Sequence, residues 1–508
     1  MNASMTKRTA SIARVFAYAM FISAVTLFFC SKSSFGYPIN DWTDANIYFT
    51  IGKGITRGQV VYRDLYDHKG PLLYMLHALC ALISPMSFTG VYLLEIICSA
   101  AFLTIAFQLM TIYGAKGSRY FALPLISFLI FTSTSFEQGD SAEELCLCLL
   151  VFSLYDILRH LKTEYPRRMS AKHLIINGVV FGAVFWIKFT MVGLFAGFLL
   201  TLFLLHGARR EWKHAFSSVG WFLLGFVIST LPWLLYFGIN DALLPWMKTY
   251  LYDNLFLYSS SEESAGLVMR LGDIAKSALS WGVSNLRYTL LIAIGLAFGI
   301  FHKSASKWQR ISLLLMFLIG ALGVFIGGKS YPYYGLILAA FVPLGMIPLC
   351  LLADRFIQRL PKAQKFLPAL CCICCAMCFA LSYQLSPNVK TSFGQDRSTT
   401  MQYQFAAILS EYENPTLLNY GFMDAGFYTA SGITPDVKYF HQTNVPLEEM
   451  TQEQIRYIEG GVCDFIVTRG KQPESIDNLY ELIATADAPD HFWYDHVYLY
   501  KLKTLASP

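Results

Sequence analysis

The chain has 508 residues, of which 55% are hydrophobic and only 14% are charged, with a formal net charge of +5. Soluble globular proteins carry about 25% charged residues, so this chain has too few charges to cover a soluble surface. No stretch shows the basic stripe of a nucleic-acid-binding surface, which argues against nucleic acid as a partner.

Long apolar segments account for the missing charge. A membrane-spanning helix needs about 20 apolar residues, and eleven segments approach or exceed that length. They are residues 12–31, 88–113, 120–136, 142–158, 172–187, 189–206, 216–237, 283–301, 311–327, 334–352 and 366–385. The first lacks an evident small-residue cleavage site and is interpreted as an uncleaved span. The sequence therefore predicts a polytopic α-helical membrane domain over residues 1–385.

Basic loops set the predicted topology. The stretch 71–85 is short for a span, and Pro71 suits the first turn of a helix. If 71–85 lies along the membrane surface without crossing, all five basic loops face the cytoplasm, as the positive-inside rule requires. These loops are residues 114–119, 159–172, 208–214, 302–310 and 355–365. The prediction is a multi-pass plasma-membrane protein with its N-terminus cytoplasmic, its C-terminus outside, and a long first outer loop, 32–87.

The first outer loop begins with "NDWTDANIYFTIGKGI", residues 40–55. Apolar side chains recur at helical spacing there, which predicts an amphipathic helix on the outer interface. Asp41 and Asp44 lie near its start. One interpretation is that Asp41 caps the helix and Asp44 complements its dipole. The other is that one of these carboxylates faces a cavity and removes a proton from an acceptor hydroxyl.

The next polar stretch of this loop is "VVYRDLYDHKGPL", residues 60–72. Arg63 and Lys69 could pair with Asp64 and Asp67 in a solvated salt-bridge loop. Alternatively, Lys69 binds a phosphate at the level of the lipid headgroups, with Arg63 as a second cation. In that interpretation Asp67 and His68 are candidates for contacting the substrate.

Acidic residues also precede a later span, in "GDSAEEL" at 139–145. Acids suit a helix N-terminus, so a simple capping role explains them. The alternative is a divalent cation held by Asp140 and Glu143. No other cofactor is indicated.

Two further cations interrupt or join the apolar spans. Lys188 breaks "FWIKFT", where it either extends to the outer headgroups or binds phosphate. Lys329 lies in the short hairpin "GGKSYPYYGL" (327–336) with Tyr331 and Tyr334. Such tyrosines are usually interfacial anchors, and the lysine among them makes a contact with a lipid phosphate the functional alternative.

From Ser386 onward the spans stop and a small α/β domain is predicted over 386–508. Residues 416–422, 463–470 and 496–503 have the pattern of strands, and residues 447–460 and 477–486 that of helices. Acceptor recognition and passive covering of a site are equally compatible with this extracytoplasmic domain.

The order of these motifs resembles the GT-C glycosyltransferases, specifically the bacterial branch of the protein mannosyltransferase and aminoarabinose transferase superfamily. The resemblance covers most of residues 1–350, and "YRDLYDHKGPL" is its most specific part. It implies a polyprenyl-phosphate-sugar donor, an outer-face site and inversion by single displacement. It also implies that Asp44 is the catalytic base, with Asp41 second, and that Lys69 contacts the donor phosphate. Where related bacterial proteins often have His-Tyr in the late hairpin, this chain has Tyr333 and Tyr334.

Two other membrane functions share this hydropathy. A carrier or flippase would show pseudo-symmetric repeats, and none is evident. A polymerase or ligase of lipid-linked glycans usually relies on a large outer loop, whereas 238–282 is moderate in length and poor in basic residues. The acceptor is left open among cell-surface polysaccharide, teichoic acid, glycolipid and protein, and so is the sugar.

Overall fold

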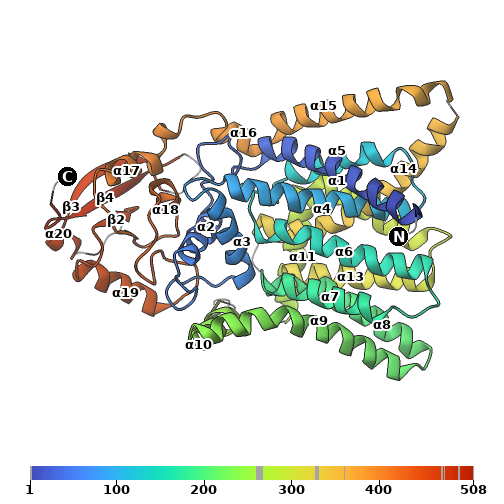
Figure 1. Ribbon diagram of the computed structural model, residues 1–508, viewed down its shortest axis with the longest axis horizontal. Helices are drawn as coiled ribbons and strands as arrows, with labels where there is room; N and C mark the ends of the chain where they lie inside the picture. Colours follow the sequence, from blue (N-terminus) through green and yellow to red (C-terminus); the bar gives the residue numbers. More distant parts are fainter. Residues whose placement is uncertain are drawn as a thin grey trace. The chain divides into compact units, whose positions relative to one another are not determined.

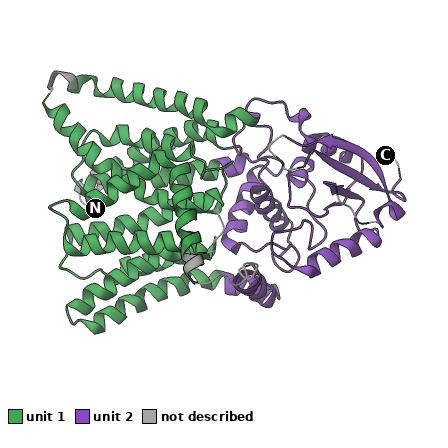
Figure 2. Ribbon diagram, turned by 180° about the vertical axis from the view of Figure 1, so that it is seen from behind, with its two compact units in different colours: residues 1–31, 93–232, 265–391 green, residues 32–92, 233–264, 392–508 purple. Residues whose placement is uncertain are grey.

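The computed structural model describes residues 3–258, 267–326, 331–359, 361–470, 473, 475–489, 492 and 494–506. The chain divides into two compact units, coloured separately in Figure 2. Unit 1 comprises residues 1–31, 93–232 and 265–391, and unit 2 comprises residues 32–92, 233–264 and 392–508. The predicted boundary at residue 386 stays a prediction, and unit 2 also takes in the first loop and a short central segment.

Unit 1 is helical. In chain order its elements, some of which extend a few residues into unit 2, are α1 (Ala3–Cys30), α4 (Thr89–Ile112), α5 (Arg119–Phe131), α6 (Ala142–Thr163), α7 (Ala171–Phe185), η1 (Phe189–Val192), α8 (Gly193–Ala208), α9 (Trp212–Ile239), α11 (Leu267–Ser284), α12 (Leu286–Phe301), α13 (Lys307–Phe325), η3 (Pro332–Phe341), α14 (Val342–Gln358), η4 (Pro361–Phe366), α15 (Leu367–Leu385) and α16 (Pro387–Ser392) (Figure 1).

Each of the eleven predicted spans overlaps a helix of this unit. Seven helices of the described chain are long and apolar enough to cross a membrane, and α11 with α12 form one further candidate bent by 109°. The helices α5 and α7 are shorter, and α6 has the length but carries several charged residues. The polytopic α-helical fold predicted from the sequence is confirmed, and the protein is a multi-pass membrane protein.

Small residues bring the helices of unit 1 together. A Cβ on Gly178 of α7 would lie 1.9 Å from the Phe222 carbonyl oxygen of α9, and one on Gly225 would lie 2.1 Å from the Ile175 oxygen. Only glycine permits this backbone approach, which is the usual way for helices to pack where lipid supplies no hydrophobic driving force.

Unit 2 combines short helices with one sheet. Its elements are α2 (Thr43–Thr56), α3 (Pro71–Ile83), α10 (Leu243–Trp246), the π-helix η2 (Met247–Tyr258), η5 (Arg397–Thr399), α17 (Met401–Leu409), β1 (Leu417–Asn419), α18 (Phe427–Ser431), α19 (Glu448–Glu459), β2 (Phe465–Thr468), α20 (Ile476–Leu479), β3 (Tyr480–Asp487) and β4 (His496–Leu502). The strand order is β1-β2-β4-β3, with β1 parallel to β2 and the other neighbours antiparallel.

The predicted helix over 477–486 is wrong. Most of this segment is the strand β3, which pairs with β4 from Tyr480 opposite Leu502 to Asp487 opposite His496. A register irregularity between Leu482 and Ala484 accompanies the pairing. Locally the residues favour a helix, but a strand gains the ladder of hydrogen bonds that β4 offers, and tertiary pairing outweighs local propensity.

The two predicted helices of the first loop are present. Pro71 begins α3, as expected for the first helical turn. At 13 residues α3 is too short to span a bilayer, and it leaves Leu79, Leu82 and Ile83 exposed. The helix α2 does not expose a polar face as predicted for an interfacial helix, because every residue from Asp44 to Gly54 is buried. Gly52 allows α3 to pack closely, since a Cβ there would lie 2.6 Å from the His77 carbonyl carbon.

Candidate active site

Asp44 lies in the first turn of α2 and is almost completely buried. Its Oδ2 accepts a hydrogen bond of 3.1 Å from the hydroxyl of Tyr48, one helical turn further on. The i, i+4 spacing places both side chains on one face of the helix. Asp44 is therefore a carboxylate fixed in orientation by a neighbour on its own helix.

Asp41 has a different role from the capping role considered above. The residue before α2 is Trp42, and no side chain caps the helix. Instead, both oxygens of Asp41 accept hydrogen bonds from the Lys32 ammonium, at 2.7 and 2.9 Å. The two side chains are 8% and 1% exposed, respectively. Asp41 thus neutralises a buried lysine, which leaves Asp44 as the stronger candidate for a base.

Residues 60–66 form a compact loop. The Arg63 guanidinium pairs with Asp64 at 2.8 Å and donates a hydrogen bond of 2.6 Å to the Asn240 carbonyl oxygen. Asp64 also accepts a hydrogen bond from the Val60 amide. Tyr62 adopts a φ of +71°, an uncommon conformation for a tyrosine. The salt-bridge interpretation is right for Arg63 and Asp64, and the phosphate role of Arg63 stays a prediction.

Asp67, His68 and Lys69 form a continuous row of polar contacts. The Tyr74 hydroxyl donates to Asp67 Oδ2 at 2.5 Å, and the other oxygen lies 3.2 Å from His68 Nδ1. His68 Nε2 in turn lies 3.2 Å from the Lys69 ammonium. With the imidazole proton on Nδ1, Nε2 is free to accept from Lys69. The row thereby fixes the position of the lysine head group.

The pKa shifts of Asp67 and His68 indicate the charge states in this row. Burial, aided by the positive charge of Lys69, lowers the pKa of His68, although Asp67 and Asp44 oppose that shift. Burial alone would raise the pKa of Asp67, but His68 and Lys69 hold it below its usual range. We infer a neutral imidazole between an ionised carboxylate and an ammonium at neutral pH.

Tyr48 connects the two parts of the candidate site. Its hydroxyl contacts Asp44, and the Lys69 ammonium lies 6.0 Å from the centroid of its ring. Its ring also packs edge-on against those of Tyr74 and His77 of α3. A carboxylate and an ammonium thus border one buried tyrosine, an arrangement that can accept a proton and stabilise an anion close together.

Residues 423–435, here called the strap, attach α2 to the C-terminal part of unit 2. Lys53 is 2% exposed, and its ammonium donates to the carbonyl oxygens of Tyr428 at 2.6 Å and Ile433 at 3.1 Å. Thr50 donates to Asp424 at 2.7 Å, and Thr429 donates to Asn46 at 3.1 Å. Burial lowers the pKa of Lys53 to about 7, with the charge of Asp424 acting in the opposite direction.

Replacing Lys53 with methionine is expected to loosen the strap. The variant leaves the buried Tyr428 carbonyl oxygen and the half-buried Ile433 carbonyl oxygen without this donor, which should destabilise unit 2 by about 1–3 kcal/mol. Hydrogen exchange followed by mass spectrometry should show faster exchange in α2 and in the strap. Arg456→Gln removes an exposed cation from α19 and serves as the control. Unchanged exchange in Lys53→Met would contradict the attachment described here.

His441 is a buried titratable group beside the 60–70 loop. Its Nε2 lies 3.2 Å from the Tyr66 carbonyl oxygen, and burial lowers the pKa of His441 to about 4. In the unfolded chain the pKa is about 6.5. The folded state therefore releases a proton that the unfolded state keeps between these values, and stability falls as the pH drops through this window.

Acidification from pH 6.5 to 4 is expected to remove about 3 kcal/mol of stability through His441, since each pKa unit corresponds to about 1.4 kcal/mol. His441→Gln should flatten this part of the profile of melting temperature against pH. His496→Gln, at a half-exposed histidine, is the matched control. Equal slopes in wild type and His441→Gln would refute the assignment.

A second group of predicted residues lies in unit 1. The Lys188 ammonium pairs with Glu143 at 2.5 Å and lies 3.9 Å from the Tyr334 ring centroid. Tyr331, Tyr333 and Tyr334 contact one another, with centroids 5.0–5.8 Å apart. Lys188 is 9% exposed and has this carboxylate partner within unit 1, and its extension to the outer headgroups stays a prediction. Its phosphate role stays a prediction, and Lys329 lies outside the described residues.

Asp140 and the neighbouring acids form a buried network in unit 1. The Asp140 amide donates to Glu95 Oε1 at 2.8 Å and to Glu144 Oε2 at 2.9 Å. Ser31 donates to both oxygens of Glu95. The helix cap is Ser141, which accepts from the Glu144 amide. Within the described part of the chain, no three histidine, cysteine or acidic side chains are grouped to hold a metal. The cation predicted for Asp140 and Glu143 stays a prediction.

Several residues of these clusters were missed by sequence reasoning. Lys32 follows the first span and resembles an ordinary interfacial lysine in the sequence. Tyr48 was noted for helical spacing alone, and Tyr74 lies in an apolar run. A weak signal existed for Lys32, because it lies nine residues before Asp41 in the same short loop.

Comparison with known proteins gives one family match. The family of dolichyl-phosphate-mannose-protein mannosyltransferases matches residues 68–236. No curated protein matches the sequence.

Solved structures match over nearly the whole chain. The structure of ArnT from Cupriavidus metallidurans bound to undecaprenyl phosphate superposes with a TM-score of 0.58 at 10% identity, covering 98% of this chain and 99% of that one. Its apo form gives a TM-score of 0.57 at 10% identity over 97% and 98%. The archaeal oligosaccharyltransferase AglB from Archaeoglobus fulgidus matches at 0.49 and 10% identity over 91% and 70%. The likeness to ArnT shows the fold, and the predicted resemblance to GT-C glycosyltransferases is confirmed at that level.

Proposed function

We propose that this protein is a membrane glycosyltransferase that moves a sugar from a polyprenyl-phosphate-sugar donor to an acceptor hydroxyl. The observation that carries the proposal is the position of Tyr48, whose hydroxyl contacts Asp44 and whose ring borders the Lys69 ammonium. Transfer from a lipid phosphate needs a base for the acceptor and a cation for the leaving group, and both border this residue.

The proposed reaction is a single displacement. The acceptor oxygen attacks the anomeric carbon of the donor while Asp44 takes the proton from that oxygen. The bond between the anomeric carbon and the phosphate oxygen breaks, and its electron pair leaves with the polyprenyl phosphate. Lys69 offsets the negative charge that develops on the phosphate. Attack from the opposite face inverts the anomeric centre.

Asp67 and His68 are proposed to act through Lys69. They hold its ammonium at the end of a polar row that begins at Tyr74. A fixed ammonium costs less reorganisation when charge develops on the leaving phosphate. The donor-phosphate roles of Arg63, Lys188 and Lys329, and the substrate contacts of Tyr331 and Tyr334, remain predictions of this proposal.

The comparisons support this class of activity. ArnT, whose fold this chain shares, was solved with undecaprenyl phosphate, and the family match begins at His68 and includes Lys69. Because the basic loops favour an outer position for residues 32–87, we place the reaction on the outer face of the plasma membrane. The acceptor belongs to the cell-surface polysaccharides, teichoic acids, glycolipids or proteins.

The test compares a strain lacking the gene with the same strain carrying the wild-type gene. Mass spectrometry would follow polyprenyl-phosphate sugars and the sugar composition of the cell surface. Accumulation of one lipid-linked sugar together with loss of one surface sugar supports the proposal and names donor and product. If both pools are unchanged after redundant genes have been removed, the proposal fails.

A further inference from the structure

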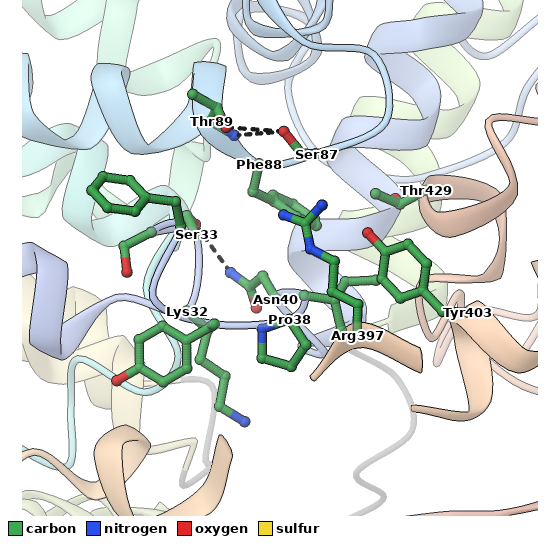
Figure 3. A pocket seen from close by; sticks show the side chains of 14 residues that line it. Lys32, Ser33, Pro38, Asn40, Ser87, Phe88, Thr89, Arg397, Tyr403 and Thr429 are labelled. Atoms are coloured by element: carbon green, nitrogen blue, oxygen red, sulfur yellow. Dashed lines mark hydrogen bonds between the residues drawn. The ribbon is translucent and has the colours of Figure 1, made fainter. Parts of the chain in front are cut away.

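The hollow beside loop residues 32–40 is too small to bind a substrate group. Its lining includes Lys32, Asn40 and Arg397 (Figure 3), and its cavity volume is about 10 Å³. That volume is room for about one water molecule. The contacts that hold Lys69, by contrast, involve a helix to which the proposed function gives no role.

Three side chains hold the backbone of Lys69. The peptide group that joins His68 to Lys69 is bonded at both ends. Its carbonyl oxygen accepts a hydrogen bond of 2.7 Å from the Asn254 side-chain amide, and its amide donates to the Tyr74 hydroxyl oxygen at 2.9 Å. The Tyr62 hydroxyl donates to the Lys69 carbonyl oxygen at 2.6 Å. A planar group bonded at both ends cannot rotate without losing a bond, so the direction in which the Lys69 side chain leaves the backbone is fixed.

Asn254 comes from the π-helix η2, which belongs to the same compact unit as the first loop (Figure 2). Helices of this type are rare and frequently occur at functional sites. The Asn254 side-chain amide also donates to the Tyr250 carbonyl oxygen of η2 itself, at 2.9 Å. Because an amide nitrogen carries two protons, it can serve both acceptors at once. One side chain thus joins η2 to the peptide group before Lys69.

Asp253, the preceding residue of η2, makes a second attachment to the same segment. Its Oδ2 accepts a hydrogen bond of 2.9 Å from the Tyr66 hydroxyl, and the residue is 1% exposed. Tyr66 directly precedes Asp67, where the row of polar contacts that ends at Lys69 includes its first carboxylate. The helix η2 therefore holds the chain both before this row and within it.

The two sides of η2 differ. Tyr250 and Asp253 are buried, whereas Tyr252, Leu255 and Phe256 are 51–59% exposed. Asn254 lies next to these exposed residues in the sequence, yet its amide is bonded to the first loop. The exposed side of η2 supplies control positions on the same helix.

We propose that Asn254 is a positioning residue for the donor phosphate. It holds the peptide group from which Lys69 extends and thereby directs the ammonium to the phosphate, while Asp253 supports this arrangement through Tyr66. The role rests on the proposed function, in which Lys69 offsets the charge of the leaving phosphate. A cation that is fixed before the reaction stabilises developing charge without the cost of reorganisation.

Binding of the leaving group tests this role without requiring transfer. Native mass spectrometry of the full-length protein would follow titrations with undecaprenyl phosphate and with uncharged undecaprenol, and the ratio of the two affinities measures the preference for phosphate. Lys69→Met should lower this preference about 10- to 100-fold, since a hydrogen bond to a charged group is lost. Asn254→Leu should lower it about 3- to 10-fold, the contribution of one hydrogen bond between neutral groups. Tyr252→Leu, on the exposed side of η2, should bind both lipids as wild type does.

The double variant Lys69→Met/Asn254→Leu separates positioning from a general structural effect. If Asn254 acts through Lys69, the double variant should have the same phosphate preference as Lys69→Met alone. Asn254→Gln keeps a donor amide and should recover part of the preference. An unchanged preference in Asn254→Leu, or independent effects of the two substitutions in the double variant, overturns the role.

Transfer kinetics give a second signature. Asn254→Leu should lower kcat/KM for the donor about 3- to 10-fold and leave the KM for the acceptor unchanged, whereas equal losses for both substrates would overturn the role. The failure of the proposed function has a different signature. If Lys69→Met keeps the full phosphate preference, the cation of the proposed reaction is wrong and the role of Asn254 fails with it. If Lys69→Met loses the preference and Asn254→Leu keeps it, only the role of Asn254 fails.

Discussion

Asp44→Asn is expected to lower kcat by about 10²- to 10⁴-fold, the usual contribution of a general base. Asparagine keeps the shape of the side chain and can still accept the hydrogen bond from Tyr48, but it cannot take the acceptor proton. The KM values for donor and acceptor should change little, because the substitution removes an interaction that is made in the transition state. Transfer rates of the purified variant and wild type in nanodiscs would measure this effect.

Tyr48→Phe is the matched control for Asp44→Asn. It removes the hydroxyl that holds the carboxylate and leaves the carboxylate itself, so the rate should fall much less. The melting temperatures of both variants should stay close to that of wild type. If Asp44→Asn retained more than a tenth of the wild-type kcat, Asp44 would not be the base.

The second large effect concerns stability. Asp41→Asn is expected to cost about 3–5 kcal/mol, because it leaves the Lys32 ammonium buried without its counter-charge. Lys32→Met should cost a similar amount by stranding the Asp41 carboxylate. Melting temperatures in detergent would detect both losses of stability. They should be measured before the transfer rates of these variants are compared.

The double variant Lys32→Met/Asp41→Leu separates the two roles of a first-loop acid. Replacing both members of a buried pair with apolar residues is often neutral or stabilising, so the double variant should recover most of the lost stability. It should also keep transfer activity if Asp44 is the base. If the double variant lost as much stability as the two single variants together, Lys32 and Asp41 would not be coupled. If it were stable but inactive, Asp41 would be implicated in catalysis.

Local patterns were sufficient for the helices of this protein. Apolar length predicts the spans, and Pro71 together with the charge of the loops predicts that α3 is short and separate from them. The helix α2 follows from the spacing of its apolar residues. What the spacing could not show is that α2 is covered on all sides, because the strap that covers it lies about 375 residues later in the chain.

The error at residues 477–486 has the same origin. Leu482 and Ala484 have helical propensity, and nothing nearby in the sequence indicates that β4 will lie alongside them. For Lys188, too, the partner could not be predicted from neighbouring residues. Its position between spans suggests a contact with lipid headgroups, but its ammonium pairs with Glu143, 45 residues earlier. In both cases the outcome depends on pairing between segments that are distant in the chain. The residues next to each segment in the sequence do not indicate such pairing.

The attachment of α2 to the strap has a consequence for biosynthesis. The Lys53 ammonium reaches its acceptor on Tyr428 only after a further 375 residues have been made. At about 5–20 residues per second, translation needs roughly 20–75 s to supply that segment. During this interval the nascent chain carries on α2 a lysine, Lys53, whose two carbonyl acceptors do not yet exist. Premature termination anywhere before the strap would leave the helix that bears Asp44 exposed to cellular proteases, so only completed chains would keep an intact first loop.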